Sequence, residues 1–264
     1  MARWTAFPQR GEFRHDPASV TRDWARLHAG DAEPPPSDTR VLEAWVLFHN
    51  GAFEEAVEAG AAAGEAGATV AIKAQCIYAN YLERKETPRL DLFLEAAQRA
   101  ERLAATHPDD PAAWYWYAYA LGRYSQAISV VQALAQGLGG KVKDALERAI
   151  ALQPRHADAH LALATFHAEV IDKVGTLIAG MTYGAKKETG LRLFEEGLRL
   201  NPHSPIVLVE YARGLVMLEG EKKLPEANRL YEQATALQPA DAMEWLQASG
   251  CADSPAPGVQ AHVR

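Results

Sequence analysis

The chain has 264 residues, 48% of them apolar, so it can bury a continuous core as one large or two small domains. A formal net charge of −7 and the lack of a long Lys/Arg run argue against a nucleic-acid partner. Cys76 and Cys251 are too few for a disulfide framework, and no segment is apolar over the length of a signal peptide or membrane span, so we expect a cytoplasmic protein without membrane contact.

The first predicted helix begins after Asp16, an N-cap residue type that is followed by Pro17 at the first helical position. Gly30 is its predicted stop, and the stretch 34–36, three prolines, is predicted to be a stiff, extended linker. One face of this helix is apolar, formed by Val20, Trp24 and Leu27. We therefore interpret residues 1–37 as an N-terminal capping segment that packs against the helices after it.

Four later segments have a common pattern, in which an amphipathic stretch ends at a proline. The prolines are Pro108, Pro154, Pro202 and Pro239. Eight residues before them stand Ala100, Leu146, Phe194 and Tyr231, and five before them stand Leu103, Ala149, Gly197 and Ala234. Nine residues after the first three prolines, a large residue is followed by alanine: Tyr117-Ala118, Leu163-Ala164 and Tyr211-Ala212. Large and small residues at this spacing predict helix faces that pack closely against one another.

This pattern resembles the tetratricopeptide repeat (TPR), a helix-turn-helix unit that ends in proline. The segment EANRLYEQATALQP matches its second helix at Ala227, Tyr231, Ala234 and Pro239, and residues 50–56 resemble its interhelix turn. The resemblance covers residues 38–248 and implies an all-α fold, a right-handed α-solenoid of about five helix pairs with a C-terminal capping helix. Residues 249–264 are expected to form a disordered tail.

Two repeats are longer than the family unit of about 34 residues. The four prolines are 46, 48 and 37 residues apart, and the alignment places the surplus within residues 122–140 and 169–184, between the two helices of a repeat. Both segments keep a helical spacing of apolar residues, so we interpret them as extensions of two adjacent first helices. Glycines provide the predicted stops, namely Gly137, Gly139, Gly140, Gly180 and Gly184.

Three histidines in the second lengthened repeat have two interpretations. His156 and His160 are four residues apart, a spacing at which two imidazoles on a helix can share a metal ion. However, His160 and His167 align with Trp114 and Leu121 one repeat earlier, which makes them core residues. No third ligand has a fixed place nearby, so we predict no metal site.

Polar residues gather in the two insertions and form the candidate binding site. The set is Arg123, Tyr124, Ser125, Gln126, Glu169, Asp172, Lys173 and Tyr183. The register places Arg123 beside Glu169, where we expect an ion pair, and Gln126 beside Asp172. These residues are interpreted either as a structural network or solvated face, or as a polar pocket or contact patch on the concave side.

The sequence has no G-x-S-x-G elbow, and neither cysteine is within sequence reach of a plausible base, so we predict no enzyme and no cofactor. What the resemblance implies is a protein-interaction module or scaffold that binds a peptide or a partner protein in a concave groove. The alternative is a small-ligand-binding or transport-associated protein that uses the polar cluster. A homo-oligomer is also possible on this sequence.

Overall fold

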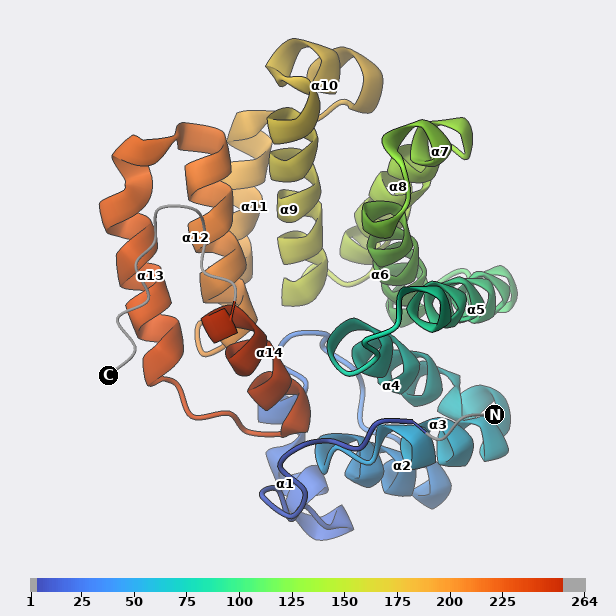
Figure 1. Ribbon diagram of the computed structural model, residues 1–264. Coiled ribbons are helices and arrows are strands. Elements are labelled where there is room, and N and C mark those ends of the chain that lie inside the picture. Colours follow the sequence, from blue (N-terminus) through green and yellow to red (C-terminus); the bar gives the residue numbers. More distant parts are fainter. Residues whose placement is uncertain (1–3, 254–264) are drawn as a thin grey trace. The chain divides into compact units, whose positions relative to one another are not determined.

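The computed structural model describes residues 4–253, except the side chains of Val130, Val131 and residues 251–253. Within this part of the chain all regular structure is helical, which confirms the predicted all-α class (Figure 1). The helices are α1 (Pro17–Leu27), α2 (Thr39–His49), α3 (Phe53–Ala62), η1 (Gly64–Gly67), α4 (Ala68–Tyr81), α5 (Glu86–Thr106), α6 (Pro111–Ala127), α7 (Val130–Ala135), α8 (Leu138–Leu152), α9 (Ala157–Val174), α10 (Thr176–Tyr183), α11 (Lys187–Leu200), α12 (Pro205–Glu219), η2 (Glu221–Lys223), α13 (Leu224–Ala236) and α14 (Ala242–Asp253). None of these described helices has the length and apolar character needed to cross a bilayer.

The chain forms two compact units, although the sequence predicts one repeat domain over residues 38–248. Unit 1 contains Met1–His28, Ala32–Pro154 and Ala240–Met243, and unit 2 contains Ala29–Asp31, Arg155–Pro239 and Glu244–Arg264. The main boundary between the two units along the sequence therefore follows Pro154, one of the prolines that end a repeat. The predicted tail began too early, because α14 continues to Asp253; the rest of that prediction, residues 254–264, lies outside the described residues.

The longer helices pack as pairs in chain order within each unit, with the short α7 and α10 between the members of two pairs. In unit 1, α2 packs against α3, α4 against α5, and α6 against α8; in unit 2, α9 packs against α11 and α12 against α13. Figure 1 shows α9, α11, α12 and α13 running side by side within unit 2. These are the helix-turn-helix pairs that the sequence pattern predicts.

The residues of the aligned pattern occupy the interfaces between these helices. All four residues eight positions before the prolines are buried, and Phe194 is fully so. The alanines of the second motif, Ala118, Ala164 and Ala212, are also buried. Small residues allow the backbones to approach, and large ones fill the space between them. The structure thus confirms the packing pattern predicted from the sequence.

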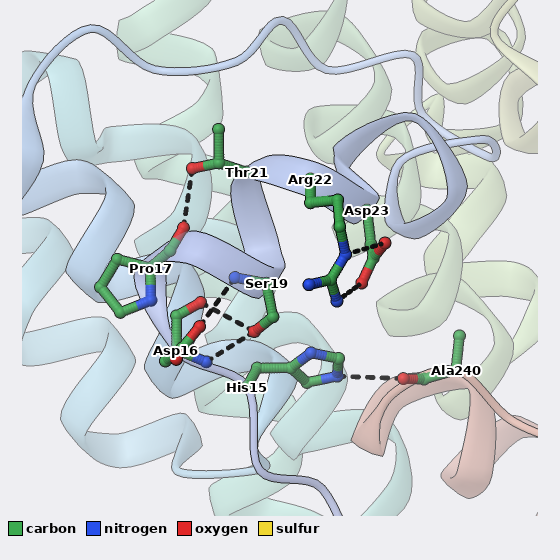
Figure 2. A network of polar contacts seen from close by, with 8 residues as sticks. All are labelled: His15, Asp16, Pro17, Ser19, Thr21, Arg22, Asp23 and Ala240. Atoms are coloured by element: carbon green, nitrogen blue, oxygen red, sulfur yellow. Dashed lines mark hydrogen bonds and ion pairs between the residues drawn. The ribbon is translucent and has the colours of Figure 1, made fainter.

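The N-terminal helix forms as predicted but ends earlier. The Asp16 carboxylate accepts a hydrogen bond from the Ser19 N–H at 2.7 Å, and the Ser19 hydroxyl accepts one from the Asp16 N–H, which together make a capping box (Figure 2). The predicted apolar face of α1 is buried, and the Trp24 ring meets the Trp45 ring of α2 edge-on at 5.9 Å. The helix ends at Leu27, three residues before the predicted stop at Gly30.

The two insertions do not simply extend the first helices, which corrects the sequence interpretation. Helix α6 ends at Ala127, and Ser129 then caps the separate helix α7 through a second capping box, with Gln132. Helix α9 ends at Val174, and Gly175, with φ of 79°, separates it from α10. Each insertion therefore consists mostly of a short extra helix that follows an interruption of the first helix.

Candidate functional site

The first half of the predicted polar cluster lies at the end of α6, in unit 1. The Arg123 guanidinium lies 5.3 Å from the centre of the Tyr119 ring and donates a hydrogen bond to Gln126 Oε1 at 3.2 Å. The Ser125 hydroxyl donates to the carbonyl oxygen of Gly122 at 2.8 Å, and Tyr124 is half-buried. These contacts are local to one helix and its last two turns.

The second half of the cluster lies in unit 2, at the end of α9 and on α10. Lys173 Nζ is 3.6 Å from Glu169 Oε2, one helical turn away, and Asp172 is exposed. The Tyr183 ring centre lies 6.5 Å from that of Phe166. The expected Arg123–Glu169 ion pair would join residues of different units and stays a prediction, as does a polar pocket formed by the whole set.

The three histidines of the second insertion repeat are buried, as predicted for His160 and His167. His156 caps α9, because its Nδ1 accepts the N–H of Ala159 at 3.2 Å. His167 Nδ1 accepts the N–H of Lys186 at 3.0 Å. Structural roles of this kind account for both imidazoles, and the described residues include no group of three or more potential ligands positioned for a metal ion.

A cleft in unit 1 lies between the N-terminal segment and the turn that joins α2 to α3. It has a volume of about 230 Å³, and its walls come from residues 4–7 and 10–11, residues 50–55 and Tyr78 of α4. No pattern in the sequence indicates it. One wall is thus an extended piece of the chain itself, laid on a surface made by helices.

Backbone donors and one aromatic stack hold the first residues of this segment. The Trp4 N–H donates to Glu54 Oε2 at 3.3 Å, and the Thr5 N–H donates to the Tyr78 hydroxyl at 3.1 Å. The Trp4 and Tyr78 rings stack with centres 3.9 Å apart and an interplanar angle of 16°. Burial raises the pKa of Tyr78, so its phenol keeps its proton and donates to Glu83 at 3.3 Å.

Phe7 is the apolar anchor of the segment and is almost completely buried. Its ring lies on Gly51, where φ is 81° and where an added Cβ would stand 2.6 Å from the ring. The Phe7 ring also contacts Phe53, whose ring meets it edge-on with the ring centres 6.4 Å apart. Further along, Asn50 accepts the His15 N–H at 2.8 Å and donates to the His15 carbonyl at 2.9 Å. The α2–α3 turn therefore contacts both an aromatic side chain and the backbone of the segment.

A second polar feature of unit 1 is fully buried. His49 Nδ1, on α2, donates to Asp241 Oδ2 at 2.6 Å, and both side chains are buried. The neighbouring His15 Nε2–H donates to the carbonyl oxygen of Ala240 at 3.0 Å (Figure 2). The Lys73 ammonium, also buried, lies 5.1–5.9 Å from the ring centres of Phe48, Trp45 and Trp116. The two hydrogen bonds fasten Ala240 and Asp241 to the N-terminal part of unit 1.

The burial of His49 makes stability depend on pH. Burial lowers the pKa of His49 below its ordinary 6.5, and nearby Lys73 and His15 act in the same direction, while Asp241 only partly opposes them. Below pH 6.5 the unfolded chain binds a proton that the folded chain does not, so stability present above this pH is lost as pH falls. We expect urea unfolding to show a loss of up to about 1.4 kcal/mol per pH unit below 6.5 from this residue. His49→Gln should reduce that slope, and an unchanged slope would contradict the assignment.

Comparisons with known proteins found one family model that matches part of the sequence and a solved structure that matches the fold. The family model described as "Regulator of microtubule dynamics protein 1-3" matches residues 63–186, just under half of the chain. A crystal structure described as a thermophilic TPR protein from Thermus thermophilus superposes with a TM-score of 0.57 at 16% sequence identity. That match covers 80% of this chain and 96% of the other. The search of curated proteins found no match. The chain is therefore similar to TPR proteins in fold.

Proposed function

We propose that the protein is a non-catalytic interaction module that binds an extended peptide segment of a partner protein. TPR-like helical folds are suited to this role, because stacked helix pairs offer a large surface without requiring a reactive centre. The observation that carries the proposal is the docking of residues 4–7 on Glu54, Tyr78 and the α2–α3 turn, where the segment forms one wall of the cleft of unit 1. An extended chain is held there through main-chain donors and side-chain pockets, which is how peptide-recognition sites combine affinity with specificity.

The contacts also define the kind of peptide that fits. Glu54 and the Tyr78 hydroxyl accept successive main-chain N–H groups, which any extended peptide offers. Tyr78 presents a flat face to one aromatic side chain, and the Gly51–Phe53 surface takes a second aromatic three residues later. A partner segment with an aromatic pair at this spacing would compete with the chain's own N-terminal segment.

Competition gives a direct test. A fluorescent peptide with the sequence of residues 4–13 is titrated into the full chain and into the Trp4→Ala/Phe7→Ala variant. The tethered segment has an effective concentration in the millimolar range, so the unchanged protein should bind the free peptide weakly. The double variant should bind it at least about tenfold more tightly, because its own segment no longer occupies the surface formed by Glu54, Tyr78 and the α2–α3 turn.

Matched variants separate recognition from nonspecific binding. In the Trp4→Ala/Phe7→Ala background, Glu54→Gln should weaken peptide binding, whereas Glu58→Gln, an exposed residue one turn later on α3, should not. Circular dichroism checks that each variant is folded. If the Trp4→Ala/Phe7→Ala variant does not bind the peptide, or if Glu54→Gln and Glu58→Gln bind it equally in that background, the proposal fails.

A further inference from the structure

The two insertions are alike in charge as well as in position. Residues 124–140 contain no charged side chain and are bounded by Arg123 and Lys141, and residues 174–185 contain none and are bounded by Lys173 and Lys186. Each includes the short extra helix of its repeat, α7 or α10. An uncharged helical stretch with a cation at both ends occurs where protein meets a membrane surface, because lysines reach the headgroups while apolar residues enter the acyl region.

Helix α10 shows its apolar side to solvent. Leu177 is 75% exposed, Ile178 is 54% exposed and Met181 is 82% exposed, and these three positions lie on one arc of the helix. On the side that packs against α9, the buried residue is the small Ala179. A helix that existed to stabilise unit 2 would have the opposite arrangement, with its large side chains buried. Leu134 of α7, at 51% exposure, repeats this feature in the other insertion.

Polar groups border this apolar arc at both ends. Lys173 precedes α10 and Lys186 follows it, and both are exposed. Tyr183, at the last position of the helix, is half-buried and brings a ring with a polar end to the same border. Of the predicted polar cluster, Glu169, Asp172 and Lys173 lie on the last two turns of α9, before α10 begins, and Tyr183 belongs to α10.

We propose that α10 is a membrane-contact element, which inserts Leu177, Ile178 and Met181 into the interface of a bilayer that contains anionic lipids. The flanking Lys186 would then lie at the level of the headgroup phosphates, and Lys173 would exchange its Glu169 partner, 3.6 Å away, for a phosphate at the same level. This does not require a membrane span, so it goes beyond the sequence expectation of no membrane contact, which rested on the lack of a spanning segment. It is independent of the peptide cleft in unit 1.

A bilayer suits this element better than a second copy of the chain. Eight helical residues are about 12 Å long, whereas a stable protein interface buries about 800 Å² on each partner, more than such a short helix offers. An interfacial helix needs no matching shape on the other side and enters only about 5–10 Å. The lysines at its ends complement phosphates rather than the apolar core of a dimer interface.

The test uses the full chain and sedimented vesicles of phosphatidylcholine, with and without phosphatidylglycerol. We expect the protein to bind the mixed vesicles, and Leu177→Gln/Ile178→Gln/Met181→Gln to weaken this at least about tenfold, the value of burying one such side chain. Lys173→Gln/Lys186→Gln should abolish the preference for phosphatidylglycerol. Hydrogen exchange of residues 176–183 should slow on vesicles.

Met217→Gln is the matched control, because Met217 is an exposed methionine on α12 of the same unit. It should bind vesicles as the unchanged protein does. The triple variant changes only exposed side chains, and its thermal unfolding verifies that it is folded. No vesicle binding, or equal binding by the triple variant, overturns the proposal. Self-association that the triple variant abolishes, without vesicle binding, overturns it in favour of an interface between copies.

Discussion

Replacing Asp241 by alanine is expected to lower the free energy of unfolding of unit 1 by about 3 kcal/mol. The carboxylate accepts the Nδ1–H of His49 at 2.6 Å, and neither side chain reaches solvent. Breaking a buried pair usually costs about 3–5 kcal/mol. The lower end applies here, because a lowered pKa leaves His49 uncharged at neutral pH, so its lost partner exposes an unpaired dipole rather than an unpaired charge.

Two further variants identify the cause of this loss. Asp241→Asn keeps an oxygen that accepts from His49 and should recover most of the stability. Asp23→Ala removes an exposed carboxylate that pairs with Arg22 and should change nothing measurable. Urea unfolding at pH 7.5, with hydrogen exchange resolving the two units, measures the effects. If Asp241→Ala is as stable as Asp23→Ala, the contact does not hold residues 240–243 in place.

Local spacing was sufficient to predict the helix pairs and their packing residues. A large residue such as Phe194 and a small one such as Gly197 stand three residues apart on the same helix. This spacing lies within one helix, so a longer or shorter loop does not change it. The insertions were harder, because a helical spacing of apolar residues continues across a break. Ser129 starts the extra helix α7 through a capping box, and Gly175 separates α9 from α10 through its positive φ. Both were present in the sequence as signals.

The candidate site could not be predicted in this way. Trp4 and Phe7 stand in a stretch without periodicity, and they matter only because Gly51 and Tyr78, some 45 to 75 residues later, form a surface for them. His49 and Asp241 are 192 residues apart in the sequence. Contacts of this kind depend on the folded arrangement of several helices, and spacing within one helix carries no information about them.

The largest loss in unit 2 is expected for Phe194→Ala, about 3–5 kcal/mol. The Phe194 ring is fully buried, stacks on Tyr211 at 5.4 Å, and lies directly against Gly214 of α12, where an added Cβ would collide with it. Because Gly214 has no side chain that could move into the space that the ring leaves, we expect a cavity to remain there. Gly214→Ala alone should cost about 1–3 kcal/mol, since the buried ring has little room to shift.

The double variant Phe194→Ala/Gly214→Ala tests whether these two losses have the same origin. The alanine methyl group then occupies part of the vacated space, so the double variant should be at least about 1 kcal/mol more stable than the sum of the single changes predicts. Gly197→Ala is the control, because its Cβ would meet its nearest neighbour, the Ala157 carbonyl oxygen, at 3.5 Å, an ordinary contact. It should fold as stably as the unchanged protein. Additive losses would show that α11 and α12 do not depend on this ring-on-glycine contact, and that the large-and-small pattern has another cause.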